Sequence, residues 1–463
     1  MKRWLTALAL SWSTMLLAQT DSTQRFAPGA LRADLDSLYA ALRDNHPALY
    51  AQWPKADADR AFQRLRAQVQ APMTRLEFYR LTMPFVSHFR DGHTYLELDL
   101  ESPDMAAYEK AGGRYFPLRV AIIGERLFTR EAAGGAAAGT EIRGINGKAS
   151  GKIIRELVAD FPADGAENAR ASVERLFGWM LWLRYGWGTR NRLELATASG
   201  KRNLELPGVD HDRMFANFFP NGPTRELELH PEVSLGVVHI RNYHQTAKSK
   251  QFIDSCFRVL RASGIRNVAL DLRLNGGGDS EIGTYFLRHI TTKPQVMTRS
   301  KSWRLGPLVT ALPATHWMAR TIEGQRRTFT LAGEFLTSPP FEPEPLPALP
   351  DSLFLNARLF VLTSPRTFSS AHMTALAVKC SGMGTLIGQP TGERLDLTGE
   401  VLDYQLPHTR IGLSIPAAQY RSACGKGSQV GVQPDIVVNP TAADLQAGRD
   451  AAMEKLKAEI RKQ

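Results

Sequence analysis

One stretch decides the fold: Leu359-Phe-Val-Leu-Thr-Ser-Pro-Arg-Thr-Phe-Ser-Ser-Ala-His372. Residues 359–362 predict a buried strand, and residues 373–379 predict a helix. Ser369 then lies at a strand-to-helix elbow, where the free N–H groups of a helix N-terminus point toward developing negative charge. This position favours a nucleophile. The alternative is that Ser369 only caps the helix, because serine is a preferred N-cap residue.

A second apolar strand ends in three glycines, in Val268-Ala-Leu-Asp-Leu-Arg-Leu-Asn-Gly-Gly-Gly-Asp-Ser280. Glycine permits positive φ and lets a ligand approach the backbone closely. The amide of Gly276 or Gly277 is therefore a candidate for one half of an oxyanion hole, with the Ser370 amide as the other half. A simple tight turn is the alternative. A phosphate loop is disfavoured, because neither Gly-Lys-Ser/Thr nor GxGxxG is present.

Four motifs in this order resemble the S41 serine peptidases, the family of the C-terminal processing proteases and the tricorn-like peptidases. They are Asp271-Leu-Arg-x-Asn-Gly-Gly-Gly278, Thr367-Phe-Ser-Ser-Ala-His372, Gly388-Gln-Pro-Thr-Gly392 and Gly431-Val-Gln-Pro-Asp435. The resemblance extends over about residues 30–440 and includes the N-terminal element Asp91-Gly-His-Thr94. It implies an α/β fold with a crotonase-like (ClpP/crotonase) catalytic core, a degenerate PDZ-like β-rich domain and serine-type hydrolysis of peptide bonds by acyl transfer.

The general base departs from the processing-protease branch of this family. In that branch the base is a lysine, and the matching position here holds Arg394. Arginine stays protonated in proteins, so it does not accept a proton from serine. The tricorn-like branch implies a histidine base instead, which His93 matches, and imidazole suits this role near neutral pH. His372, on the helix that follows Ser369, is a second and weaker candidate.

The carboxylate that would orient His93 is left open by the sequence. The glutamate of the tricorn-like branch matches a position near Ser428. Another carboxylate, such as Glu393 or Asp91, would then orient the imidazole. Thr94, which follows His93, is a candidate for an accessory hydroxyl near the site.

Composition bounds the class of protein. A chain of 463 residues with 43% hydrophobic residues suits two or three domains with ample core. The net charge of +11 is scattered, without a dense basic run and interleaved aromatics, so we expect no nucleic-acid partner. Three cysteines (Cys256, Cys380 and Cys424) allow one disulfide and leave one thiol over. Without a CxxC or Cys/His cluster, we predict no metal site and no cofactor.

The N-terminus predicts export. A basic Met1-Lys-Arg3, an apolar stretch over residues 4–17 and Ala18 before a cleavage point form a secretory signal pattern. The alternative, an uncleaved anchor, is disfavoured because the apolar stretch is shorter than the ~20 residues of a membrane span. No later run is long enough to span a bilayer, so we expect a periplasmic or secreted protein.

The hydrophobic pattern divides the chain into five regions. They are a signal peptide at 1–18, a helical region at 19–105, a PDZ-like domain with a helical insert at 106–210, an α/β catalytic domain at 225–440 and a C-terminal helix at 441–463. Residues 164–190 would interrupt a standard PDZ module, so a β-rich spacer is the alternative there. Residues 300–352, with their proline-rich end, are interpreted as an insertion that wraps the site rather than as a linker. The polar tail predicts an exposed helix.

The function predicted from these observations is that of a secreted or periplasmic serine peptidase acting on a peptide or protein substrate. One rival is an S41-like scaffold that binds peptides or small ligands without turnover, motivated by the missing dyad lysine. Another is a crotonase-like enzyme acting on acyl-CoA thioesters, which the signal segment disfavours because acyl-CoA is cytosolic.

Overall fold

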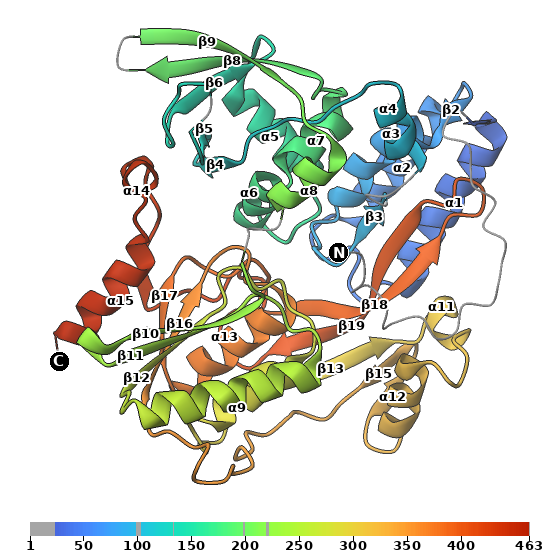
Figure 1. Cartoon of the computed structure of the whole chain (residues 1–463). Coiled ribbons are helices and arrows are strands. Elements are labelled where there is room, and N and C mark those ends of the chain that lie inside the picture. The colour runs from blue at the N-terminus through green and yellow to red at the C-terminus, as the bar shows by residue number, and fades with distance from the viewer. Residues whose placement is uncertain (1–23, 99–102, 133, 198–199, 219–221, 463) are drawn as a thin grey trace.

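The computed structural model describes residues 24–98, 103–132, 134–197, 200–218 and 222–462. The predicted signal peptide at residues 1–18 lies outside these residues. The described chain is a mixed α/β structure with two six-stranded sheets in its C-terminal half, one of which also takes the short β3, a third sheet in the middle of the sequence and helices at the N-terminus (Figure 1).

The central sheet has the strand order β10-β11-β12-β16-β17-β20. These strands are Arg225–His230, Leu235–Ile240, Asn267–Asp271, Arg358–Thr363, Thr385–Gly388 and Ile436–Val437. Only β10 runs antiparallel to its neighbour; the other pairings are parallel. Their near-continuous apolar runs are typical of parallel strands that are covered on both faces. The two strands predicted at 268–274 and 359–362 are therefore neighbours in one sheet.

Helices cover both faces of the central sheet. Three helices share one apolar core with the sheet: α9 (Thr246–Ala262), α10 (Ser280–Arg288) and α13 (Ser369–Ser381). The opposite face packs against α15 (Ala451–Arg461), which follows the short α14 (Ala442–Ala447). The prediction of an exposed C-terminal helix is wrong in this respect. Ala452, Leu456 and Ile460 form an apolar stripe at four-residue spacing, and this stripe is buried on the sheet.

A second, antiparallel sheet has the order β14-β15-β13-β19-β18, and β3 also pairs with β19. These strands are Thr330–Ala332, Phe335–Thr337, Thr298–Arg304, Gly412–Ser422, Leu397–Gln405 and Tyr95–Glu97. The interval 300–352 thus supplies strands to this sheet as well as α11 (Pro307–Thr310), α12 (Trp317–Gln325) and a proline-rich loop. Through β3, the sheet joins the N-terminal region to the C-terminal half of the chain.

The N-terminal region is helical, as predicted. It contains α1 (Pro28–Asn45), α2 (Lys55–Gln68), α3 (Arg75–Ser87) and α4 (Pro103–Lys110), with a two-stranded β1–β2 pair (Arg25–Phe26 and Met73–Thr74). Leu31, Leu35, Leu38 and Leu42 of α1 are fully buried, as the helical spacing of its apolar residues predicts.

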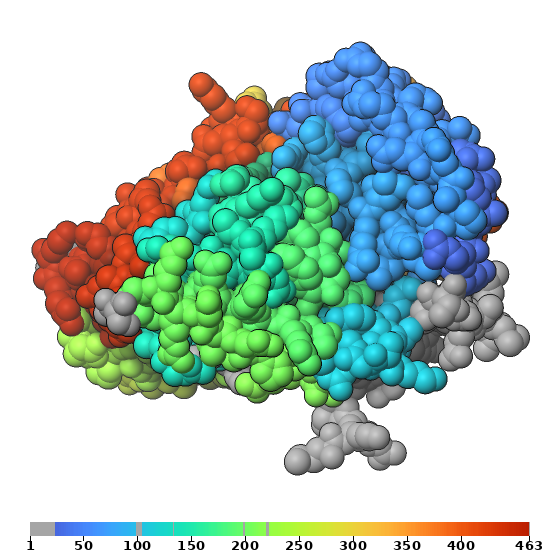
Figure 2. Space-filling model, turned by 90° about the horizontal axis from the view of Figure 1, so that it is seen from above, coloured from blue at the N-terminus to red at the C-terminus, as the bar shows by residue number. Residues whose placement is uncertain are grey.

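Residues 115–218, called the middle segment below, form the third sheet with order β4-β5-β6-β8-β9 and a short β7. Its strands are Val120–Ile123, Arg126–Thr129, Glu141–Ile145, Lys148–Ala149, Arg190–Thr197 and Gly200–Pro207. Its helices are α5 (Ser150–Asp160), α6 (Ala166–Arg175), α7 (Phe177–Tyr185) and α8 (His211–Phe218). Helix α7 is a buried core helix. In Figure 2 the middle segment (cyan to green) and the N-terminal helices (blue) lie side by side on one face.

Within the described residues, no helix combines the length and the apolar character needed to cross a bilayer. Cys380, near the end of α13, forms a disulfide with Cys424, and Cys256 is a buried free thiol. The disulfide joins helix α13, which begins at Ser369, to the loop that follows β19.

We expect the double variant Cys380→Ala/Cys424→Ala to lower the free energy of unfolding by about 2–4 kcal/mol, because the crosslink restricts the unfolded chain. Urea unfolding under non-reducing conditions measures this loss. Cys256→Ala is the control for removing a cysteine outside the disulfide. Adding a reductant should destabilise the wild type but not the double variant, and an equal effect on both proteins would contradict the prediction.

Candidate active site

The elbow predicted between strand and helix is present. Helix α13 begins at Ser369, whose φ of +51° is in the left-handed region that non-glycine residues seldom adopt. No side-chain hydrogen bond caps this helix, so the Ser369 hydroxyl is not used as an N-cap. The loop is held by its neighbours instead: Thr367 Oγ1 donates to the Leu272 carbonyl at 2.8 Å, and the Phe368 N–H donates to the Asn275 carbonyl at 3.1 Å.

His93 reaches Ser369 from a position 276 residues earlier in the chain. Its Nε2 lies 3.3 Å from Ser369 Oγ. Pairing of β3 with β19 and a hydrogen bond from Ser414 Oγ to the His93 carbonyl at 3.0 Å place it there. The ring of Phe368 packs against the imidazole, with 4.9 Å between centroids. Gly92 permits this approach, because a Cβ at that residue would lie 2.6 Å from the Phe368 ring.

Glu393 is the carboxylate beside the imidazole. Its Oε1 lies 3.3 Å from His93 Nδ1, within ion-pair range but without the alignment of a hydrogen bond. Its Oε2 accepts the Ser369 N–H at 2.6 Å. The side chain is almost completely buried. Of the two carboxylates considered from the sequence, Glu393 is the one whose carboxyl group contacts the His93 ring.

The glycine loop lies directly against the elbow. A Cβ at Gly277 would be 2.6 Å from Ser369 Cβ, and Gly277 has a φ of +101°, so only glycine fits there. The Gly277 N–H donates to Asn275 Oδ1 at 2.8 Å. Among the described residues, the N–H groups of Gly276 and Ser370 have no acceptor, and the Ser370 hydroxyl donates to the Gly278 carbonyl at 2.5 Å. Within the described chain, the amides of Gly276 and Ser370 are therefore free to donate to a ligand.

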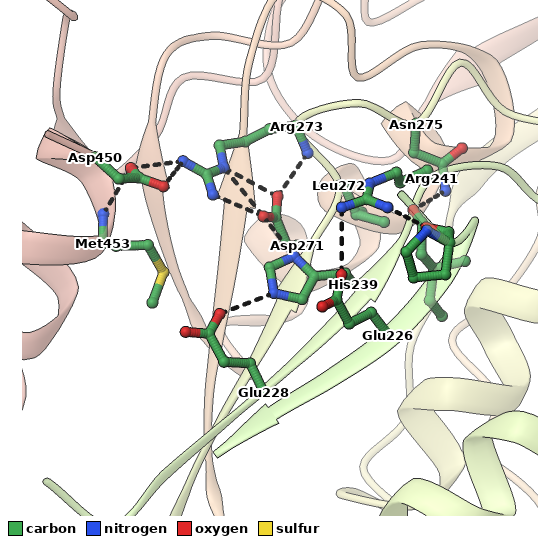
Figure 3. A network of polar contacts seen from close by, with 12 residues as sticks. Glu226, Glu228, His239, Arg241, Asp271, Leu272, Arg273, Asn275, Asp450 and Met453 are labelled. Carbon is green, nitrogen blue, oxygen red and sulfur yellow. Dashed lines mark hydrogen bonds and ion pairs between the residues drawn. The ribbon is translucent and has the colours of Figure 1, made fainter. Parts of the chain in front are cut away.

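Asn275 organises this loop, a role that the sequence analysis did not assign to it. Its buried side chain donates from Nδ2 to the Ile240 carbonyl at 2.9 Å while Oδ1 accepts the Gly277 N–H. Asp271 and Arg273 of the same motif form a separate network (Figure 3). Arg273 bridges Asp271 and Asp450, the N-cap residue of α15. The sequence signal that could have identified Asn275 was its position inside the glycine motif.

Asp91 supports the histidine loop without contacting the His93 ring. Its carboxylate accepts the His93 N–H at 2.8 Å and the Thr398 hydroxyl at 2.7 Å, and it pairs with His46 Nε2 at 3.2 Å. Burial would raise the pKa of Asp91, but the hydrogen bond and charge of His46 outweigh this and hold that pKa below its usual range. Thr94 is buried, and its hydroxyl has no hydrogen-bond partner among the described residues.

The two remaining sequence candidates lie beside the reacting pair. His372 is fully buried, its Nδ1 lies 2.7 Å from the Thr391 hydroxyl, and burial lowers its pKa to about 3. It therefore supports the Glu393 loop, and its Nε2 has no hydrogen-bond partner among the described residues. Arg394 Nη1 pairs with Asp164 Oδ1 at 2.9 Å and also donates to the Arg90 carbonyl at 2.6 Å.

One short part of the middle segment contacts all three loops that carry Ser369, His93 and Glu393. Asp164 Oδ2 accepts the Gly92 N–H at 3.1 Å, next to His93, and Asp164 also binds Arg394, next to Glu393. Asn168 Nδ2 donates to the Pro365 carbonyl at 2.7 Å, in the Ser369 loop. Sequence analysis missed both residues, because they lie in the stretch that was interpreted only as an interruption of the PDZ-like domain.

Burial and the proximity of several carboxylates determine the pKa values of the residues around His93. Burial raises the pKa of Glu393 well above its usual range, and the negative charge of Asp164 adds to the shift, while the Ser369 N–H opposes it. Burial likewise raises the pKa of Asp164 to about 7. Burial lowers the pKa of His93, and the charges of Asp91 and Glu400 offset this only in part. A neutral His93 therefore persists below the pH at which an exposed histidine becomes protonated.

A serine on a strained strand-to-helix turn, an imidazole in contact with it and a carboxylate behind the imidazole are the groups that serine hydrolases use for nucleophilic catalysis. Residues 234–438, from β11 to β20, match the family model described as peptidase family S41. This match confirms the resemblance inferred from the motifs, and this part of the chain is an S41 peptidase domain. The matched range contains Ser369 and Glu393, whereas His93 lies outside it.

Solved structures show the same fold. Mature CPAF complexed with lactacystin has a TM-score of 0.67 at 14% identity, over 94% of this chain and 98% of that chain. A CPAF mutant has a TM-score of 0.68 at 13% identity, over 94% and 97%. A protein from Parabacteroides merdae has a TM-score of 0.50 at 14% identity, over 93% and 96%. A comparison with curated proteins gives no match.

We expect Asp164→Asn to move the acid limb of the pH profile for fluorophosphonate labelling of Ser369 to lower pH. Removing the Asp164 charge removes a negative neighbour of Glu393, which lowers the pKa of Glu393 and keeps its carboxylate ionised in more acidic solution. Labelling rates measured against pH test this.

The matched control is Asp160→Asn, four residues earlier, where the carboxylate faces Arg184 instead of the site. No displacement is expected for this control. A limb that stays in place or moves to higher pH in Asp164→Asn would contradict the electrostatic role.

Proposed function

We propose that this chain is an exported serine peptidase that hydrolyses peptide bonds through an acyl-enzyme. Ser369 is the nucleophile, His93 is the general base and Glu393 orients His93. The observation that carries the proposal is the contact series Ser369 Oγ–His93 Nε2 and His93 Nδ1–Glu393 Oε1, each 3.3 Å long. In this series, His93 takes the place of the lysine base of the processing-protease pattern, because the lysine position holds Arg394.

In the first step, Ser369 Oγ forms a bond to the substrate carbonyl carbon while its proton moves to His93 Nε2. The carbonyl oxygen becomes an oxyanion, which accepts hydrogen bonds from the Ser370 amide and from an amide of the glycine loop. Gly276 fits this role as the loop stands, whereas Gly277 would first have to release Asn275 Oδ1. Charge on Glu393 stabilises the imidazolium that forms.

The second half of the reaction follows from the same groups. His93 returns the proton to the leaving amine nitrogen as the carbon–nitrogen bond breaks, which leaves an acyl group on Ser369. Water then attacks the acyl carbon with His93 again as base, and the Ser369 hydroxyl is restored. The glycine loop and the elbow are held by backbone hydrogen bonds, so the oxyanion donors need little reorganisation.

The finer assignments of fold and compartment belong to the same proposal. We interpret the central parallel sheet with α10 and α13 as a crotonase-like core, and the middle segment as a degenerate PDZ-like domain. Export to the periplasm or beyond is supported by the signal pattern over residues 1–18 and by the Cys380–Cys424 disulfide, since disulfides persist in oxidising compartments.

Ser369→Ala should remove both fluorophosphonate labelling and peptide hydrolysis, with a loss on the order of 10⁶-fold as for other serine proteases that lose their nucleophile. Its free energy of unfolding should stay within about 1 kcal/mol of the wild type. Ser370→Ala retains its backbone amide and should still label at Ser369. A folded wild-type protein that neither labels nor hydrolyses a peptide library would instead support the binding scaffold.

Glu393→Gln should lower kcat by about 10³- to 10⁴-fold, because the Gln amide N–H₂ faces His93 Nδ1 and favours the wrong tautomer. Peptide hydrolysis and thermal unfolding are measured together. Asp91→Asn is the comparison: its carboxylate binds His46 and Thr398, so we expect a lower unfolding temperature and a smaller loss of kcat. A larger loss of kcat in Asp91→Asn than in Glu393→Gln would assign the orienting role to Asp91.

A further inference from the structure

A cavity of about 480 Å³ lies between the middle segment and the central sheet. His239, Asp271, Ser364 and Gln389 line it from the carboxyl ends of β11, β12, β16 and β17, or from the residues just after them. The carboxyl edge of a parallel sheet is where α/β proteins bind ligands. The opposite wall comes from β4 and α6 of the middle segment, and α14 closes one end.

Among the described residues, all but one of the arginines that line this cavity form an ion pair with a carboxylate. Six arginines line it. Five have carboxylate partners: Arg130 with Glu174, Arg170 with Glu167, Arg241 with Glu226, Arg273 with Asp271 and Asp450, and Arg449 with Asp444. Figure 3 shows the pairs of Arg241 and Arg273. In the part of the chain that the structure describes, the Arg366 guanidinium has neither an ion-pair nor a hydrogen-bond partner.

The surroundings of Arg366 disfavour an isolated cation. Burial lowers the pKa of its guanidinium to about 10, and the positive charges of Arg175 and Arg130 add to the shift, while Glu174 opposes it. A partly buried charge without a counter-charge costs free energy that an anion would recover. The planar fork of a guanidinium matches a carboxylate with two parallel hydrogen bonds. A carboxylate would supply the partner that the Arg366 guanidinium lacks in the described chain.

Arg366 also lines a second, smaller cavity of about 190 Å³, together with Leu274. Its apolar walls come from Phe116, Leu118, Phe177, Met214 and Phe218, and its polar lining includes Arg119, the Arg130–Glu174 pair, Arg175 and Asn217. Apolar walls beside a guanidinium that also faces the larger, polar cavity suit a ligand that carries a carboxylate next to an apolar side chain.

The two cavities share four lining residues, Arg130, Glu174, Leu274 and Arg366, and the last two lie just before the loops of Ser369 and Gly276. Arg366 precedes Ser369 by three residues, and Leu274 precedes Gly276 by two. Three residues of extended chain span at most about 11 Å, so Arg366 lies within reach of a peptide bound at Ser369. The hydrogen bond from the Phe368 N–H to the Asn275 carbonyl joins the two loops.

We propose that Arg366 and these two cavities form a subsite that binds a peptide carboxylate next to an apolar side chain. This deepens the proposed function and rests on it, because it names the class of peptide that the site selects. The carboxylate belongs either to the C-terminus of the peptide or to an Asp or Glu side chain. A guanidinium recognises both in the same way.

The test is direct binding of fluorescent peptides to Ser369→Ala protein, which requires no turnover. Two pairs of apolar peptides separate the sources: a free C-terminal acid against its amide, and an amidated peptide with Glu against the same peptide with Gln. We expect one carboxylate-bearing peptide to bind about 10-fold tighter or more than its neutral partner, the gain of a charge-assisted hydrogen bond.

Arg366→Met in the same background should remove this preference, and Arg366→Lys should keep only part of it, since lysine retains the charge but not the fork. Arg326→Met, which removes the arginine at the C-cap of α12, is the matched control and should keep the preference. Circular dichroism and thermal unfolding verify that each variant is folded. Equal binding of acid and neutral peptides, or a preference that survives Arg366→Met, would overturn the subsite.

Labelling of the wild type separates this proposal from the one on which it rests. A preference for carboxylates in a protein that fluorophosphonate does not label would support the subsite and contradict the peptidase. Labelling of Ser369 without any carboxylate preference would support the peptidase and contradict the subsite.

Discussion

The contact between the Ser369 elbow and the glycine loop is the constraint on which the rest of the site depends. β12 and β16 are parallel neighbours, so the loops that leave their carboxyl ends emerge side by side. The elbow then packs so closely on Gly277 that no Cβ fits between them, and the Phe368 N–H donates to the Asn275 carbonyl. This packing holds Ser369 in its left-handed conformation, a strain that only a surrounding rigid structure maintains.

The other parts of the site are added to this contact from distant segments. His93 arrives on the β3 pairing with β19, and Glu393 on the loop between β17 and β18. Asp164 and Asn168 of the middle segment contact the three loops and so connect them. The consequence is electrostatic as well as geometric. Asp164 and Glu393 both have raised pKa values because they are buried close to one another and to Asp91, with Arg394 as their nearby cation.

Local patterns in the sequence were sufficient to predict the helices and strands but not everything that packs against them. The strand over 359–362, the following helix and the glycine loop were predictable because apolar runs, turn residues and motif order are local properties. The C-terminal helix was also predictable, but its polar composition concealed a short apolar stripe, so its burial on the sheet was not. The interval 300–352 was interpreted as an insertion, since the pairing of β13 with β19 spans more than a hundred residues.

The sequence by itself determined which residue types were available: a serine at an elbow, a glycine loop, a histidine in Asp91-Gly-His-Thr94 and an arginine where a lysine base would stand. It left Glu393 and Asp91 equal as partners of His93. Both lie near a motif, and their positions along the chain do not show which carboxyl group points toward the imidazole. Only the tertiary structure decided that Glu393 contacts the imidazole ring, that Asp91 contacts its backbone, and that Arg366 has no ion-pair partner among the described residues. Those outcomes depend on long-range packing and on which buried charges meet, and no local pattern encodes either.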